Sequence, residues 1–182
     1  MALTATMYRI SVALSDVDRG VYESLDLRLA RHPSESMRFM LTRLFAYCLS
    51  YEEGISFSKE GLCAAEDPPI TVRDPTGLLM AWIDIGSPSA ERLHKASKAA
   101  ARVALFTYAP LVLLRREAAT RPIHKLAEIE VWRMDGAFLD ALEPKIERNA
   151  KMELVRNEGQ LYVTIAGGVL ESALERCSLV EE

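Results

Sequence analysis

The stretch LLMAWIDIGSPSAERLHKASK, residues 78–98, constrains the fold more than any other part of the chain. In an extended strand, successive side chains point to opposite faces. Over residues 78–85 both faces would be apolar, and Asp84 is the only charge. A strand that is apolar on both faces is typical of the centre of a sheet that is covered on both sides. We therefore expect a central strand at residues 78–85.

Asp84 stands at the carboxyl end of this expected strand, just before Gly86 and a helix that we expect to open at Ser87 and Pro88. Open α/β sheets usually bind their ligands at this position. A buried carboxylate without a partner is costly, so Asp84 needs a cation, a hydrogen-bond donor or a metal. The nearest cations that we consider in the sequence are Lys95 and Lys98 on the following helix.

The length of 182 residues and the 49% of hydrophobic residues predict a single domain, residues 1–182, with one continuous core. A membrane span and a secretory signal are not expected, since there is neither a long apolar run nor a basic and then apolar start. Cys48, Cys63 and Cys177 are odd in number and have no paired spacing. They indicate a cytoplasmic protein with free thiols and no zinc motif. The oligomeric state stays open.

The charge is unevenly placed along the chain. The net charge is −4, but residues 87–126 carry 8 Lys/Arg and 2 Asp/Glu, a local net charge of +6. The segments on either side, residues 1–86 and 127–182, are both acidic. A basic segment directly after Asp84 could form a positive surface for phosphates. The alternative is a solvated helix face that its acidic neighbours offset.

The sequence pattern predicts a mixed α/β sandwich, a central mixed sheet flanked by helices with antiparallel hairpins at both ends. Apolar side chains from Met37 to Leu49 recur at helical spacing, and we expect this helix to open around Pro33 and to end near Gly54. Further helices are expected at 87–102, 109–121 and 136–146. Strands are expected at 3–14, 21–30, 70–73, 78–85, 103–108, 127–134, 152–155 and 160–166, with a strand or helix at 169–174.

A hairpin from Ile70 through the central strand places the start of its first arm beside the end of the second. This brings Asp67 within reach of Asp84. Glu35 lies in the first turn of the first expected helix, well away from the centre of its apolar stripe. Its charge fits a role in stabilising the helix start at least as well as a functional role.

The residues limit the chemistry. There is no G-x-S-x-G motif and no phosphate-binding glycine loop, and the three histidines, His32, His94 and His124, are scattered. Carboxylates and a lysine remain. Asp67 and Asp84 could hold Mg²⁺, with Mn²⁺ as a substitute, while Lys95 orients water against a phosphodiester. A structural ion pair between Asp84 and Lys95 explains the same residues without catalysis.

Five phrases in the chain resemble a known family. They are RHPSE (31–35), GLCAAEDP (61–68), WIDIG (82–86), RLHKA (92–96) and VALFTY (103–108). In this order, over nearly the whole chain, they are similar to the bacterial YaeQ family. The resemblance implies a compact variant of the PD-(D/E)XK nuclease-like fold, with a core of helix, three-stranded meander, helix and strand.

The resemblance also implies roles for particular residues. Asp67 would be the first acid of the nuclease motif, Asp84 the second, and Glu35 the acid that some relatives carry on the first helix. Gly86 stands where the motif has lysine, so the basic role would pass to Lys95, or to Lys98. For such a function we ourselves expect the basic face that carries Arg92, Lys95, Lys98 and Arg102 to be the surface for DNA or RNA.

Two functions follow as expectations. The first is a Mg²⁺-dependent nuclease with a displaced lysine. The second is a catalytically inactive module on the same fold, which binds nucleic acid or a protein partner. Asp84 held in a tight ion pair, with Asp67 turned to solvent, would favour the second.

Overall fold

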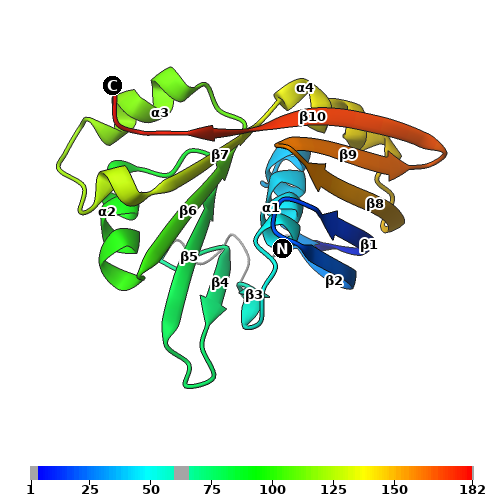
Figure 1. Ribbon diagram of the computed structural model, residues 1–182, viewed down its shortest axis with the longest axis horizontal. Coiled ribbons are helices and arrows are strands. Elements are labelled where there is room, and N and C mark those ends of the chain that lie inside the picture. The colour runs from blue at the N-terminus through cyan, green and yellow to red at the C-terminus, as the bar shows by residue number, and fades with distance from the viewer. Residues whose placement is uncertain (1–3, 60–65, 182) are drawn as a thin grey trace.

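The computed structural model describes residues 4–59 and 66–181. Within these residues, ten strands form one mixed sheet and four α-helices pack against it (Figure 1). The predicted mixed α/β class is therefore confirmed. Cys63 and most of the phrase GLCAAEDP lie outside the described residues. None of the helices in the described ranges is long and apolar enough to cross a bilayer.

The strands are β1 (Thr6–Asp16), β2 (Val21–Arg31), β3 (Ile55–Phe57), β4 (Ile70–Arg73), β5 (Leu79–Ile85), β6 (Arg102–Thr107), β7 (Glu130–Met134), β8 (Asn149–Asn157), β9 (Gln160–Ile165) and β10 (Gly168–Cys177). The helices are α1 (Met37–Leu49), α2 (Ala90–Ala99), α3 (Leu111–Ala118) and α4 (Gly136–Leu142). The order in the sheet is β2-β1-β8-β9-β10-β7-β6-β5-β4-β3.

Strand β10 joins two halves of this sheet. Its residues 168–173 pair with β9, and its residues 174–177 pair with β7. Figure 1 shows the halves diverging from β10, with β2, β1, β8 and β9 on one side, β7 to β3 on the other, and α1 between them. The last element of the chain is thus a strand, and it makes the sheet continuous.

Helix α1 begins later than the sequence indicated. The side chain of Ser36 accepts a hydrogen bond from the backbone N–H of Phe39 and caps the helix, so Pro33 lies outside it. At the other end, Arg19 from the β1–β2 turn donates to the backbone carbonyls of Cys48 and Tyr51. These bonds join the β1–β2 turn to the C-terminal end of α1.

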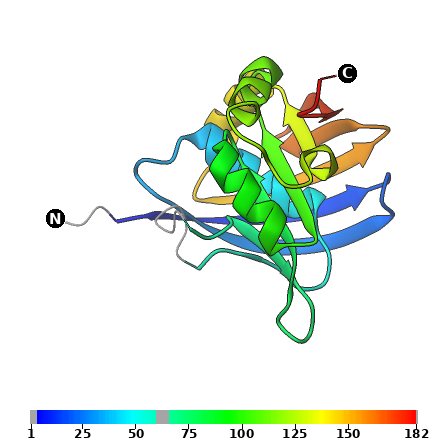
Figure 2. The ribbon, with the colours of Figure 1, turned by 90° about the vertical axis from the view of Figure 1, so that its left-hand side faces the viewer.

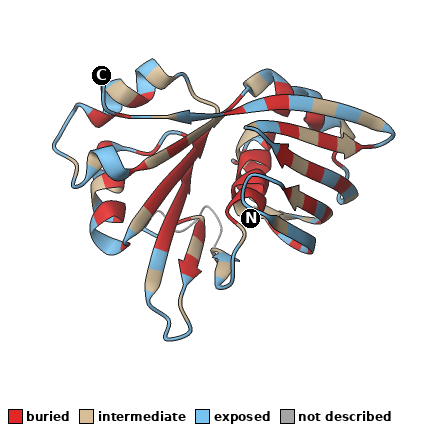
Figure 3. Cartoon of the chain, in the orientation of Figure 1, coloured by how far each residue is buried: buried red, intermediate tan, exposed pale blue. Residues whose placement is uncertain are grey.

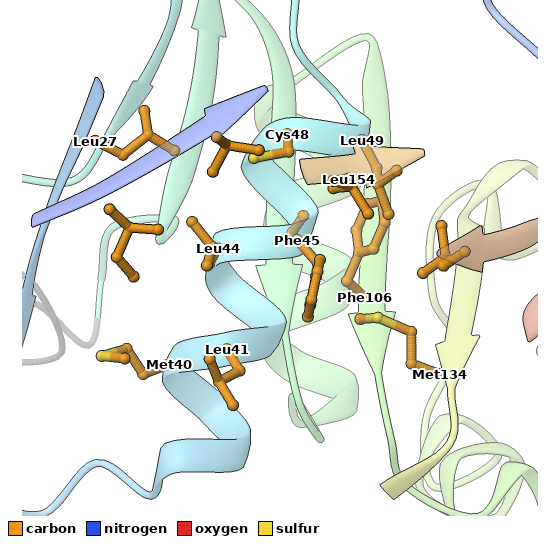
Figure 4. Packing of buried hydrophobic residues seen from close by; sticks show 14 of the residues in the cluster. Leu27, Met40, Leu41, Leu44, Phe45, Cys48, Leu49, Phe106, Met134 and Leu154 are labelled. Carbon is orange, nitrogen blue, oxygen red and sulfur yellow. The ribbon is translucent and has the colours of Figure 1, made fainter. Parts of the chain in front are cut away.

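The expectation of a one-sided apolar stripe on this helix was too narrow. Ten of the thirteen residues of α1 are buried, including Thr42 and Arg43 (Figure 3). The reason is that both halves of the sheet cover it. In Figure 4, Leu44 and Phe45 stand among side chains that come from strands of both halves, Leu27 on one side and Phe106 on the other. A helix enclosed in this way is apolar on nearly all sides.

Strands β5, β6 and β7 run parallel in the second half, and α2 covers β5 and β6 on the face turned away from α1 (Figure 2). A second apolar cluster forms there from Trp82, Leu93, Ala96, Val103 and Leu105, among others. Helix α2 begins at Ala90 because Ser89 caps it, so the expected start at Ser87 was wrong.

The sequence placed most other elements correctly. The hairpins β1–β2 and β8–β9 and the strand order around β5 are confirmed. The elements α1, β3 to β5, α2 and β6 follow one another as helix, three-stranded meander, helix and strand. The first residues of the expected central strand are wrongly placed, since Leu78 and Met80 are 62% and 40% exposed near the tip of the β4–β5 hairpin.

Candidate functional site

Asp84 lies near the end of β5, on the face that α2 covers. Ile83 and Ile85 point into the core around α1, whereas Trp82 belongs to the cluster under α2. Because side chains alternate along a strand, Asp84 shares the face of Trp82. Its side chain is only 3% exposed. The central position that the sequence indicated for this carboxylate is therefore observed.

Both oxygens of the Asp84 carboxylate have partners. Oδ2 accepts hydrogen bonds from Nε of Arg92 at 2.7 Å and from Nε1 of Trp82 at 3.3 Å. Oδ1 accepts one from the backbone N–H of Ile85 at 3.2 Å. Burial of a charge requires such pairing. The expected ion-pair partner, Lys95 or Lys98, is thus corrected to Arg92.

Arg92 comes from the first turn of α2, whose Ser89 cap fixes the start of the helix. Side chains of a helix lean toward its N-terminus, which directs Arg92 back over the end of β5. Its guanidinium lies 5.6 Å from the centre of the Trp82 ring and donates to the backbone carbonyl of Asp67 at 2.9 Å. Trp82 and Asp84, two positions apart on one strand, therefore hold Arg92 between them.

The start of β4 lies beside the end of β5, as the sequence predicted, since Ile70 pairs with Ile83. Asp67 reaches the site through its backbone carbonyl, while its side chain is exposed. Lys95 forms an ion pair with the carboxylate of Glu66, and this contact lowers the pKa of Glu66. The pair is solvent-exposed, where such contacts contribute little to stability. Lys95 therefore sits beside the site, but its charge is directed to Glu66.

The groups around Asp84 can be compared with the ligands that a magnesium ion requires. Mg²⁺ prefers free carboxylate oxygens in an octahedral arrangement. Here the Asp84 carboxylate is already bound by the guanidinium of Arg92. Within residues 4–59 and 66–181, no three side chains of His, Cys, Asp or Glu lie close enough together to hold a metal ion. The residues as arranged do not fit a two-carboxylate magnesium site.

Glu35 lies beside α1, which packs on the opposite face of β5 from Asp84. Just before α1, its carboxylate binds the guanidinium of Arg43 at 3.0 Å, and both side chains are buried. Arg43 also donates to the carbonyl of Ala30, and His32 N–H donates to Glu35. Burial raises the pKa of Glu35 and lowers that of Arg43, because both charges have left water. Glu35 thus joins α1 to the end of β2, and the structure does not bring it to Asp84.

The expected basic face on and after α2 is largely neutralised. Arg102, at the start of β6, pairs with Glu130, so three of the four expected cations have acidic partners, and only Lys98 has none among the described residues. Lys98, Arg121 and His124 all lie near His94. The backbone N–H of His124 donates to Nδ1 of His94 at 3.1 Å. Loss of hydration and the charges of Arg121, Lys98 and His124 lower the pKa of His94.

We call the four residues His94, Lys98, Arg121 and His124 the basic surface. Arg121 and His124 were not predicted, because they follow α3 and lie far from α2 in the chain. The only signal for them was the net charge of residues 87–126. Neither Lys98 nor Arg121 forms a salt bridge with a described residue, and both residues are exposed.

A family model described as YaeQ protein matches residues 1–174 of the chain. The chain belongs to the YaeQ protein family. It is 32% identical to "Uncharacterized protein YaeQ" of Escherichia coli (strain K12), over 90% of this chain and 91% of the relative. It is 31% identical to the protein of the same name in Salmonella typhi, over 96% of both chains.

Two solved structures of YaeQ proteins have the same fold. The crystal structure of YaeQ protein from Xanthomonas axonopodis pv. citri superposes with a TM-score of 0.87, at 26% identity, over 96% of this chain and 99% of the other. That from Pseudomonas syringae gives 0.86, at 30% identity, over 96% of both. The ten-stranded sheet wrapped around α1 is thus also the architecture of these YaeQ structures.

A substitution of Glu35 tests whether its carboxylate stabilises the fold. Glu35→Gln leaves the buried charge of Arg43 without its counter-ion, and we expect the free energy of unfolding to fall by about 3 kcal/mol. Urea unfolding measures this. Glu153→Gln, on an exposed face of β8, is the control and should change stability by less than about 0.5 kcal/mol.

Replacing both partners, in Glu35→Gln/Arg43→Met, removes the buried charges together. We expect this double variant to be less destabilised than the sum of its single changes. A Glu35→Gln variant that is as stable as the wild type, or more stable, would show that the carboxylate does not stabilise the fold. Glu35 would then again be a candidate functional residue.

Proposed function

We propose that this member of the YaeQ family binds nucleic acid without hydrolysing it, through the basic surface on α2 and the segment after α3. The observation that carries the proposal is the different state of two sets of cations. Arg92 and Lys95 are neutralised by Asp84 and Glu66, whereas Lys98 and Arg121 have no acidic partner among the described residues. Solvent-facing cations that cluster on one face are what a phosphate backbone requires.

We further propose that the core is a PD-(D/E)XK nuclease-like arrangement. The succession of α1, the β3–β5 meander, α2 and β6 supports this, as does a buried acid near the end of β5. The motif's lysine position is Gly86, whose φ of +82° favours glycine. With this lysine absent, Asp84 held by Arg92 and the Asp67 side chain turned to solvent, the site does not bring a free acid and a free base together for phosphodiester hydrolysis.

Magnesium-dependent hydrolysis remains a second candidate, because one observation favours it. Arg92 contacts both the side chain of Asp84 and the backbone carbonyl of Asp67, so the two residues that we expected to bind the metal both contact one guanidinium. A movement of Arg92 toward a bound phosphate would free Asp84. This candidate requires such a movement, and the first proposal does not.

Salt-dependent binding of labelled oligonucleotides tests the first proposal. Fluorescence anisotropy with single- and double-stranded DNA and RNA should show binding that weakens as salt rises. We expect Lys98→Ala and Arg121→Ala each to weaken binding several-fold and to lower the slope of log Kd against log salt by about 1. Lys151→Ala, which removes an exposed cation from β8 on the other half of the sheet, is the control and should change neither quantity.

No binding of any of the four probes at low salt would contradict the proposal. Binding that depends on Lys151 and not on Lys98 or Arg121 would place the nucleic acid on another surface.

Calorimetric titration with Mg²⁺ and Mn²⁺ separates the two candidates. Since Arg92 occupies the Asp84 carboxylate, we expect no saturable binding to the wild type and no difference in Asp84→Asn. Incubating the bound oligonucleotides with Mg²⁺ should leave them intact. Saturable binding that disappears in Asp84→Asn and persists in the Glu153→Gln control, together with cleavage, would establish the second candidate instead.

A further inference from the structure

The two edges of the sheet differ sharply. The edge strand β3 has only three residues, whereas the edge strand β2 has eleven and pairs with β1 over its full length without a register shift. β2 contains neither proline nor glycine. A long, regular edge strand presents a row of free backbone groups, and proteins usually cover, break or use such an edge.

The register shows which backbone groups of β2 face outward. Arg9 and Val17 of the β1 region donate their N–H groups to Arg148 and Arg156 of the β8 region, so odd-numbered residues there bond toward β8. Even-numbered residues of β1 therefore bond to β2, and their partners in β2 are odd-numbered. The backbone groups of the even-numbered residues of β2 must point to the free edge.

One contact agrees with this assignment. The carbonyl of Ala30 accepts a hydrogen bond from Arg43 of α1, so it does point away from β1. Nearer the β1–β2 turn, Tyr22, Ser24, Asp26 and Arg28 are all exposed. Asp26 accepts a hydrogen bond from Ser11, and neither Asp26 nor Arg28 forms a salt bridge with a described residue.

We propose that β2 pairs with β2 of a second copy of this chain, antiparallel and around a two-fold axis at Leu27. In this register Asp26 lies opposite Arg28 of the second copy, and Arg28 lies opposite Asp26. Glu23 and Arg31 are paired in the same way on the other face. A two-fold interface must be self-complementary, and opposite charges directly across a strand pair are favourable.

The charges also exclude the neighbouring registers. A shift of two residues one way brings Asp26 opposite Asp26, and a shift the other way brings Arg28 opposite Arg28. Like charges directly opposite each other destabilise a strand pair. A shift of one residue would turn the buried face of Leu25, Leu27 and Leu29 against the exposed face of the partner strand. The charge pattern of β2 thus selects one register with itself.

Sedimentation velocity over a range of protein concentrations tests this pairing. The wild type should sediment with twice the 20.3 kDa mass of one chain. Asp26→Arg places arginine opposite arginine, and Arg28→Asp places aspartate opposite aspartate, so each should shift the dimer dissociation constant upward at least tenfold. The double variant Asp26→Arg/Arg28→Asp restores opposite charges across the axis and should restore the dimer.

Glu171→Arg, an equal charge reversal at an exposed position of β10, is the control and should dimerise as the wild type does. Circular dichroism and thermal unfolding check that each variant is folded. A wild type that stays monomeric at the highest concentration overturns the proposal. So does a dimer that both single reversals leave intact, since the interface would then lie elsewhere.

Discussion

The enclosure of α1 between the two halves of one sheet is the constraint on which the rest of this structure depends. Because β10 pairs with β9 along its first part and with β7 along its second, the sheet can diverge and still stay continuous. The helix fills the space between the halves. Met40, Leu41, Leu44, Phe45, Ala46 and Cys48 are all 0% exposed. Burial on this scale is the main favourable term in folding, and it requires a helix that is apolar on nearly all sides.

An enclosed helix must satisfy its polar groups without water, and this determines the role of several charges. Arg19 donates hydrogen bonds to backbone carbonyls at the C-terminal end of α1. The ion pair of Glu35 and Arg43 joins the N-terminal half of the helix to β2. Asp84 obeys the same rule on the other face of the sheet, where Arg92 and Trp82 hold it. Two of the three acids that we expected at a nuclease site, Asp84 and Glu35, are therefore paired with arginines.

Local sequence pattern predicted much of the fold, because alternation and helical spacing are local signals. It located the hairpins, the central β5 strand and the approach of Asp67 to the end of β5. It did not predict that β10 would join two half-sheets, since that depends on pairings between distant strands. For the same reason it predicted only one apolar face for α1. The strands β1, β8 and β9 were predicted, but not that their half of the sheet covers the other side of this helix.

At the candidate site, too, local features could be predicted and contacts between distant elements could not. The position of Asp84 could be predicted from the strand in which it lies, and its partner could not. Lys95 and Lys98 were expected as partners because they lie on the helix that follows Asp84, yet Arg92 is closer to the start of α2 and leans toward β5. Arg121 and His124 reach α2 only through the folding of the segment after α3. Side-chain pairing across elements therefore decided which cations were neutralised and which faced solvent.

A double-mutant cycle on Asp84 and Arg92 tests the central claim, that this carboxylate is held in a stabilising ion pair. The free energy of unfolding in urea would be measured for Asp84→Asn, Arg92→Gln and the double variant. We predict that each single change destabilises by about 2 kcal/mol and that the pair is coupled by about 1–2 kcal/mol. An Asp84→Asn variant more stable than the wild type, with no coupling to Arg92, would contradict this account, because it would mark Asp84 as an acid retained for chemistry at the expense of stability.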